Sequence, residues 1–253
     1  MRKGKIVTLA TQKGGTGKST IALNIGHALH CKGVRVAIVD SDEQASAVSF
    51  YGQRRITANE SELVDFDMGF PEVAKISSNA PYRKQLERIT EFYDVVIVDT
   101  KGEFDQFQHD LLRMSDYVIS PVQASEFDLE PTKLVRDAVS HENTQREADE
   151  QLGLSYVLSK VNPSANSTKH VARLIGDMGC HLMSRSIRTA DVISAVSALG
   201  FTILDAAKNT SMINQVINKR RHPSERASFD KDQVLDIAES VKQIADELVE
   251  RLE

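Results

Sequence analysis

A glycine- and lysine-rich loop near the N-terminus constrains the fold of this chain more than any other feature. Residues 12–20 read Gln-Lys-Gly-Gly-Thr-Gly-Lys-Ser-Thr, between the apolar run 6–10 and a helical pattern. A strand, a glycine loop and a helix in this order form a phosphate-binding loop, because glycines let successive backbone N–H groups turn inward around a phosphate. The loop therefore predicts a nucleotide-binding α/β protein.

Two side chains of the loop have distinct expected roles. Lys18 is expected to reach the β- and γ-phosphates, and the Ser19 hydroxyl is expected to bind Mg²⁺. The positive end of the following helix adds its field to the site. The residues expected to surround the phosphates are Gly14, Gly15, Thr16, Gly17, Lys18, Ser19 and Thr20.

Two details set this loop apart. The strict pattern requires a glycine five residues before Gly17, where this chain has Gln12, and a second lysine, Lys13, precedes the glycine pair. In this form the loop resembles the deviant Walker A loop of the ParA/MinD family of ATPases. The resemblance implies that Lys13 binds nucleotide across a dimer, reaching the ATP of the other subunit. A glycine-rich turn with two solvated lysines is the alternative, but it does not explain why strand, glycines, lysine and hydroxyl fall in register.

Short apolar runs alternate with helical patterns along the whole chain. This alternation is typical of βαβ units, and it predicts an α/β fold with a mostly parallel, twisted sheet and helices on both faces. The expected strands are 6–10, 34–39, 95–98, 117–122, 154–158 and 201–204. The expected helices are near 18–31, 43–54, 82–92, 104–114, 131–150, 167–179, 189–198, 210–220 and 230–252. No shift in composition divides the chain, so we expect a single ATPase domain over residues 1–253.

Composition excludes several classes of protein. The longest apolar runs have the length of a strand, so we expect neither a signal peptide nor a membrane span. Cys31 and Cys180 form no metal-binding spacing and no disulfide framework, which favours a reducing cytoplasm. The net charge is −5, so binding to nucleic acid would require a local basic patch.

Two aspartates follow the apolar strand at 34–39, at the end of a parallel strand where ligands collect. The ParA/MinD family has the run Asp-x-Asp-Pro-Gln here, and this chain has Asp40, Asp42, Glu43 and Gln44 at the named positions. By resemblance, Asp42 orients or polarises the attacking water and Asp40 lies near the Mg²⁺ shell. A pair of aspartates that cap a helix N-terminus is the alternative.

A third acidic residue, Asp99, ends the apolar strand at 95–98. Such a carboxylate holds Mg²⁺, usually through a water. The family usually continues with Thr or Ala, then Pro and Gly, whereas this chain has Lys101 and Gly102 at the last two positions. Gly102 is a candidate hinge for a loop that senses the γ-phosphate. Lys101 departs from the family pattern and alters either the contacts of this switch loop or those of a dimer.

These three sites together point to phosphoryl transfer to water, driven by positioning and charge neutralisation. The expected catalytic residues are Lys13, Lys18 and Asp42. The expected metal-binding residues are Ser19, Asp40 and Asp99.

Residues after the strand at 154–158 flank the adenine in related proteins, so Lys160 and Asn162 are candidates for adenine binding. A plain β–α turn explains these two residues equally well. Arg185 and Arg188 lie roughly where ParA-like proteins carry a DNA-contacting arginine.

The basic residues near the C-terminus gather just before the last helix, at Lys219, Arg220 and Arg221, and they are further candidates for DNA binding. A solvated helix end is the alternative. The last helix, 230–252, has apolar residues at helical spacing but an acidic opposite face, which an anionic membrane would repel. We therefore expect this helix to pack on the core.

Over nearly its whole length the chain resembles a small ParA-type partition ATPase without the N-terminal DNA-binding domain. The resemblance implies a cytoplasmic, nucleoid-associated homodimer that uses ATP and Mg²⁺ and binds DNA nonspecifically in the ATP state. A ParB-like protein or another cargo adaptor would stimulate hydrolysis.

Three other classes of protein use a similar loop. A MinD-like membrane ATPase would need a basic C-terminal helix, and a reductase like the nitrogenase iron protein would need two cluster-ligating cysteines in each subunit. A metabolic ligase or kinase would not need Lys13.

Overall fold

A parallel sheet forms the centre of the molecule in this computed structural model, which describes residues 4–59, 69–124, 129–219 and 228–253. The strands follow the order β3-β2-β4-β1-β5-β6-β7, and β8 also pairs with β6. The strands are β1 (Lys5–Leu9), β2 (Val36–Asp40), β3 (Glu72–Lys75), β4 (Val95–Asp99), β5 (Tyr117–Val122), β6 (Gly153–Val161), β7 (His181–Leu182) and β8 (Ile187–Arg188).

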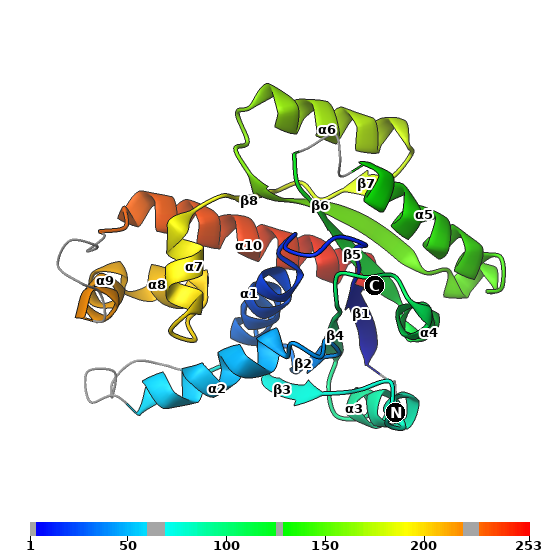
Figure 1. The fold of residues 1–253 in the computed structure, drawn as a ribbon, viewed down its shortest axis with the longest axis horizontal. Helices are drawn as coiled ribbons and strands as arrows, with labels where there is room; N and C mark the ends of the chain where they lie inside the picture. The colour runs from blue at the N-terminus through cyan, green and yellow to red at the C-terminus, as the bar shows by residue number, and fades with distance from the viewer. Residues whose placement is uncertain (1–3, 60–68, 125–128, 220–227) are drawn as a thin grey trace.

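Helices cover both faces of this sheet (Figure 1). They are α1 (Lys18–Cys31), α2 (Ser46–Ala58), α3 (Tyr82–Thr90), α4 (Gln106–Met114), α5 (Leu129–Asn143), η3 (Ala148–Glu150), α6 (Asn166–Asp177), α7 (Asp191–Ser197), α8 (Ile203–Lys208), α9 (Thr210–Lys219) and α10 (Lys231–Leu252). The α/β fold with a parallel sheet is therefore confirmed.

The core is divided by the alternation of side chains along the strands. In β4, Val95 and Ile97 join the cluster that includes α1 and α10, whereas Val96 and Val98 join the one that includes α3 and α4. Successive side chains of a strand point to opposite faces, so a strand without polar residues fits only between two layers of helices. Because β4 is held between these two layers, Asp99, its last residue, is held beside Leu9, just before the phosphate loop.

The expected strand at 201–204 is wrong. Thr202 instead caps α8: its side chain accepts a hydrogen bond from the backbone N–H of Asp205, and the Asp205 carboxylate accepts one from the backbone N–H of Thr202. The apolar run is buried as expected, but Ile203 and Leu204 are buried from the first turn of a helix. The helix expected over 131–150 ends at Asn143, and the short strands β3, β7 and β8 were not predicted.

The last helix packs on the core as predicted. Its buried residues are Val234, Ile237, Ala238, Val241, Ile244, Ala245 and Leu248. Its exposed positions include the acidic residues Asp232, Asp236, Glu239, Asp246 and Glu250. Among the described residues, no helix has both the length and the apolar character needed to cross a membrane.

Candidate nucleotide site

The loop between β1 and α1 has the backbone of a phosphate-binding loop. Gly15 has a φ of +74° and Gly17 a φ of +97°, in the left-handed region that favours glycine. Gly17 directly precedes α1, so the positive end of that helix faces the loop. The sequence pattern and the local geometry therefore agree.

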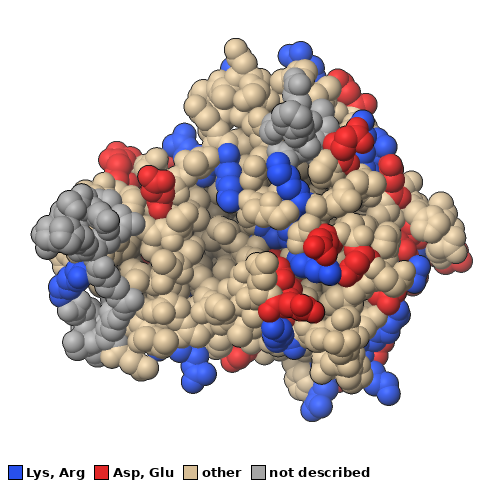
Figure 2. Space-filling view, viewed as in Figure 1, with Lys and Arg blue, Asp and Glu red and all other residues tan. Residues whose placement is uncertain are grey.

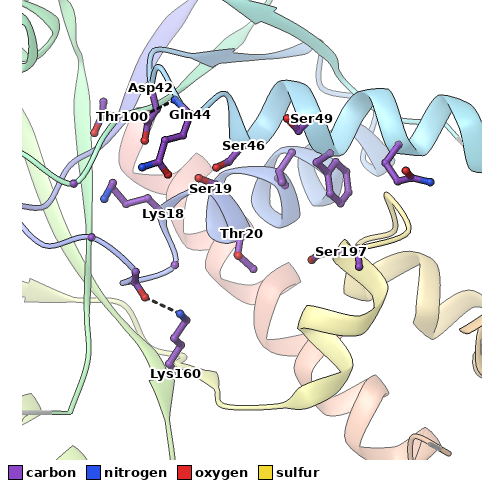
Figure 3. A pocket seen from close by; sticks show the side chains of 18 residues that line it. Lys18, Ser19, Thr20, Asp42, Gln44, Ser46, Ser49, Thr100, Lys160 and Ser197 are labelled. Atoms are coloured by element: carbon purple, nitrogen blue, oxygen red, sulfur yellow. Dashed lines mark hydrogen bonds between the residues drawn. The ribbon is translucent and has the colours of Figure 1, made fainter. Parts of the chain in front are cut away.

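A cavity of about 630 Å³ opens beside this loop. Its walls come from the loop and α1, from the segments after β2 and β4, from the end of β6, and from α2 and α7. The predicted residues that line it are Gly14, Gly15, Gly17, Lys18, Ser19, Thr20, Asp42 and Lys160. Figure 3 shows Lys18, Ser19, Asp42 and Gln44 near one another and Ser197 at the other end of the cavity. In Figure 2, Lys and Arg side chains gather near the centre of the face where the loop lies, with Asp and Glu side chains beside them.

Sequence reasoning missed the part of the cavity formed by α2 and α7. The lining residues there are Ser46, Ser49, Phe50, Gln53, Ser197 and Ala198. A serine or glutamine on a helix is an ordinary surface residue, so the sequence offers no signal that these side chains face the phosphate loop. Their position depends on how α2 and α7 pack.

Lys18 lies inside the loop with 6% of its surface exposed, and its Nζ donates a hydrogen bond of 3.4 Å to the backbone carbonyl of Lys13. Burial lowers the pKa of Lys18, while the carboxylates of Asp99 and Asp42 act in the opposite direction. The Lys13 carbonyl also accepts from the Thr16 hydroxyl at 3.5 Å. The backbone of Lys13 thus holds the loop, and its side chain is half-buried.

Asp99 is fully buried, and within the described part of the chain neither of its carboxylate oxygens has a well-formed hydrogen bond. Burial raises the pKa of this carboxyl to about 7, although the nearby Ser19 hydroxyl and the Lys18 ammonium oppose the rise. A carboxylate with free lone pairs beside a hydroxyl is a hard oxygen donor set, which Mg²⁺ accepts together with waters. Ser19 and Asp99 therefore fit a magnesium ion.

Asp40 and Asp42 have different surroundings. The Asp40 carboxylate is buried and accepts hydrogen bonds from the backbone N–H groups of Asp42 (3.0 Å), Ala47 (2.9 Å) and Val48 (3.1 Å). It therefore caps the start of α2, and its place near the Mg²⁺ shell stays a prediction. Asp42 lines the cavity, where its carboxylate accepts from the backbone N–H of Gln44 at 3.0 Å.

The end of β6 clamps the phosphate loop from the other side. The Nζ of Lys160 donates to the Gly15 carbonyl at 2.6 Å, and the Ser159 hydroxyl donates to the Thr16 carbonyl at 2.5 Å. Lys160 has a φ of +52°, an unusual backbone for a lysine, at an irregularity between β6 and β8. Asn162 is exposed and does not line the cavity. The adenine-binding role of both residues stays a prediction.

The segment after β4 lies against the phosphate loop. A Cβ atom on Gly102 would lie 2.6 Å from both the N and the Cα of Gly14. The neighbouring Lys101 pairs with Asp105 at 2.6 Å and with Glu103 at 3.4 Å. Lys101 therefore makes contacts within its own segment, and whether it alters the switch loop or a dimer stays open.

The candidate DNA-binding arginines contact α10. Arg185 donates a hydrogen bond to the side chain of Gln243, and Arg188 pairs with Asp236 at 3.3 Å. Lys219 is exposed at the end of α9, while Arg220 and Arg221 lie outside the described residues. Both arginines of the β7–β8 region thus lie beside a helix whose exposed face is acidic.

Comparison with known proteins gives a family match. A family model described as ATPase MipZ matches residues 5–148. The sporulation initiation inhibitor protein Soj of Bacillus subtilis is 28% identical over 155 residues, which are 50% of this chain and 61% of Soj. The maintenance of carboxysome distribution protein A of Halothiobacillus neapolitanus is 25% identical over 228 residues, 87% of this chain and 98% of that protein.

The solved structures extend the likeness in fold over nearly the whole chain. The complex of McdA from Cyanothece with ATP has a TM-score of 0.68 and 15% identity, and the match covers 98% of each chain. At this identity the likeness shows the fold alone.

Proposed function

Because the chain belongs to the family of the ATPase MipZ and has a ParA/MinD-type fold, we propose that it is an ATP-driven dimerising switch. Two copies would enclose two ATP molecules and bind DNA without sequence preference in that state. Hydrolysis would separate the copies and release the DNA. The observation that carries this proposal is the cavity that joins Lys18, Ser19 and Asp42 to the tightly packed Gly102.

The residues of the site divide the work of hydrolysis among them. Lys18 neutralises charge on the β- and γ-phosphates from inside the loop, where its burial strengthens the interaction. Ser19 and Asp99 hold Mg²⁺, which neutralises further phosphate charge when it is bound. Asp42 orients the attacking water from the cavity wall. Lys13 of a second copy adds positive charge in the transition state, in the manner of an arginine finger supplied in trans.

The position of Gly102 supports a conformational switch. Because its backbone touches Gly14, a change in the phosphate loop on binding or losing the γ-phosphate moves the segment after β4. That segment leads into α4, whose N-terminus is capped by Asp105. In the proposed mechanism, the nucleotide bound at the site therefore changes the position of α4.

The relatives indicate the class of cargo and the class of partner, but not which cargo or which partner. The Halothiobacillus relative is described by its part in carboxysome distribution. We infer that this chain acts in the cytoplasm on the nucleoid, and that it positions a plasmid, a chromosome or a protein assembly. A ParB-like protein or another cargo adaptor would accelerate hydrolysis.

DNA retention measured with ATP, with ADP and without nucleotide tests the switch, each over a series of salt concentrations. We expect the protein to bind DNA only when ATP is present. The affinity should weaken steeply with salt, because it depends on phosphate contacts. Binding that ignores the nucleotide, or no binding at all, would contradict the DNA switch. Retention on anionic vesicles in place of DNA would instead favour the MinD-like alternative.

A further inference from the structure

The segment 151–190 carries a charge opposite to that of the rest of the chain. It holds five of the 31 Lys and Arg residues but only one of the 36 Asp and Glu residues, a net charge of +4 in a chain of net −5. No acidic residue occurs between Glu150 and Asp177. A protein that is acidic overall thus has one stretch suited to a polyanion.

The fold places this stretch at one end of the sheet. It forms β6, α6, β7 and β8, and α6 lies at the top of Figure 1, away from α2 and α3. Val171 and Ile175 bury the inner face of α6 against β6 and β7. The exposed positions of the helix are Asn166, Ser167, Lys169, His170, Arg173, Gly176 and Asp177.

Two cations of α6 differ in their ion pairing from Arg188 of the β7–β8 region. Arg188 pairs with Asp236 of the acidic last helix. Lys169 and Arg173, one helical turn apart, form no ion pair with any of the residues that the structure describes. Their charge is therefore available to a ligand outside the molecule.

We propose that the exposed face of α6, centred on Lys169 and Arg173, contacts the phosphates of duplex DNA without reading its sequence. Asn166 and Ser167 offer the amide and hydroxyl donors that commonly join Lys and Arg on a DNA backbone. The proposal rests on the proposed function and names the surface through which it acts.

The chemistry of this face favours duplex DNA over other polyanions. None of its exposed positions is a large apolar side chain that could anchor in a bilayer. None is a phenylalanine, tyrosine or tryptophan on which the bases of a single strand would stack. Apart from Asp177 at the C-terminal end of the helix, the face offers positive charge and hydrogen-bond donors, which suit the regular phosphates of a duplex.

Few residues separate α6 from a residue that contacts the phosphate loop. Lys160 contacts the Gly15 carbonyl of the phosphate loop. Two residues later, the carbonyl of Asn162 accepts a hydrogen bond of 2.7 Å from the Thr168 hydroxyl in the first turn of α6. This short connection between the loop and α6 fits DNA binding that depends on ATP.

A double variant, Lys169→Ala with Arg173→Ala, tests the surface. DNA affinity is measured by fluorescence anisotropy with ATP and a short duplex, over a salt series. We expect the slope of log K against log salt to fall by about 0.9 for each phosphate that the variant no longer neutralises, and the affinity near 0.1 M salt to fall at least about tenfold. Thermal unfolding and ATP-dependent dimerisation of the variant check that it folds.

A matched control lies on α3, where Lys84 and Arg88 repeat the same two residue types at the same spacing, both exposed. The Lys84→Ala and Arg88→Ala double variant is expected to keep the salt slope and the affinity. An equal loss in both double variants would show a general effect of charge and would overturn the proposal.

The remaining outcomes separate this proposal from the proposed function. If the unmodified protein binds DNA with ATP and the α6 variant binds equally well, the α6 surface is wrong and the switch stands. Loss of binding only on Arg185→Ala with Arg188→Ala would place the interface on the β7–β8 region instead. If the unmodified protein never binds DNA, or if it binds phosphatidylglycerol vesicles in place of DNA, both proposals fall.

Discussion

At the scale of single residues, Asp99 combines full burial with carboxylate oxygens that have no well-formed hydrogen bond among the described residues. A buried charge without a partner is costly unless it takes up a proton or meets a cation. We therefore expect a bound metal ion to restore the stability that the ionised Asp99 costs the metal-free protein. The residue thus links folding to the proposed chemistry.

Replacing Asp99 with Asn is expected to abolish Mg²⁺-dependent ATP hydrolysis and to stabilise the metal-free protein at pH 8. The pKa of Asp99 is raised from 3.8 to about 7 in the folded protein. The folded state therefore keeps a proton that the unfolded chain releases, and the stability from this proton is lost as the pH rises from about 4 to 7. Linkage puts the loss at up to about 4 kcal/mol.

Urea unfolding of both proteins, without Mg²⁺ and between pH 4 and pH 8, measures this difference. The two free energies of unfolding should converge at low pH and separate as the pH rises. A variant that is less stable than the unmodified protein at pH 8 would show that the carboxylate has a stabilising partner.

The residues of the site differ in how well the sequence predicts them. Lys18, Ser19 and Asp99 follow from the order of residues along two strands and one loop, because the register of a parallel sheet brings strand ends together. The contact between Lys160 and Gly15 could not be predicted, since it depends on a left-handed lysine at an irregularity in the sheet. Two of the three hydrogen bonds that Asp40 accepts come from Ala47 and Val48, so they depend on where α2 packs.

At the scale of elements, the segment after β4 and the phosphate loop form one packed unit. Gly102 touches Gly14, and Gln108 of α4 donates a hydrogen bond of 2.6 Å to the Lys101 carbonyl. The same Gln108 side chain lies 3.2 Å from the Thr100 hydroxyl, which donates to the Leu9 carbonyl at the end of β1. We therefore expect movement of the phosphate loop to be coupled to α4.

Replacing Gly102 with Ala is expected to lower ATP hydrolysis at least about tenfold, because a Cβ atom that meets backbone must displace the switch segment. Gly52, in the exposed face of α2, has open space around its would-be Cβ and serves as the control. Its replacement by Ala should keep the activity and raise stability by about 0.5–1 kcal/mol through helix propensity. Steady-state ATP hydrolysis and thermal unfolding are measured for both variants. Full activity of the Gly102 variant would show that hydrolysis does not require tight packing at this position.

The elements also show where a hydrophobic pattern is ambiguous. Phe201, Ile203 and Leu204 are buried as a strand would be, but the Thr202 and Asp205 capping box makes the run the start of a helix. Asp205 further pairs with Arg54 of α2 at 2.7 Å, in a buried contact between elements far apart in the sequence. Tertiary packing of this kind overrides a short apolar pattern.

At the scale of the whole molecule, one copy of the chain holds a site that the proposed mechanism completes only with a second copy. Lys18 is buried in the loop, whereas the loop glycines Gly14 and Gly15 are exposed. An exposed phosphate loop with a half-buried Lys13 beside it fits a face that another subunit covers. Two copies related by a twofold axis would each supply Lys13 to the other.

Mixing two inactive variants tests whether Lys13 acts across the dimer. Lys13→Ala and Asp42→Ala are each expected to lose most of the hydrolysis when assayed alone. In a mixed dimer, the site that keeps Asp42 would receive Lys13 from the other copy, so one of the two sites is complete. Random pairing at equal concentrations then restores about a quarter of the unmodified rate. If Lys13 serves the ATP of its own copy, neither site of a mixed dimer is complete, and mixing restores nothing.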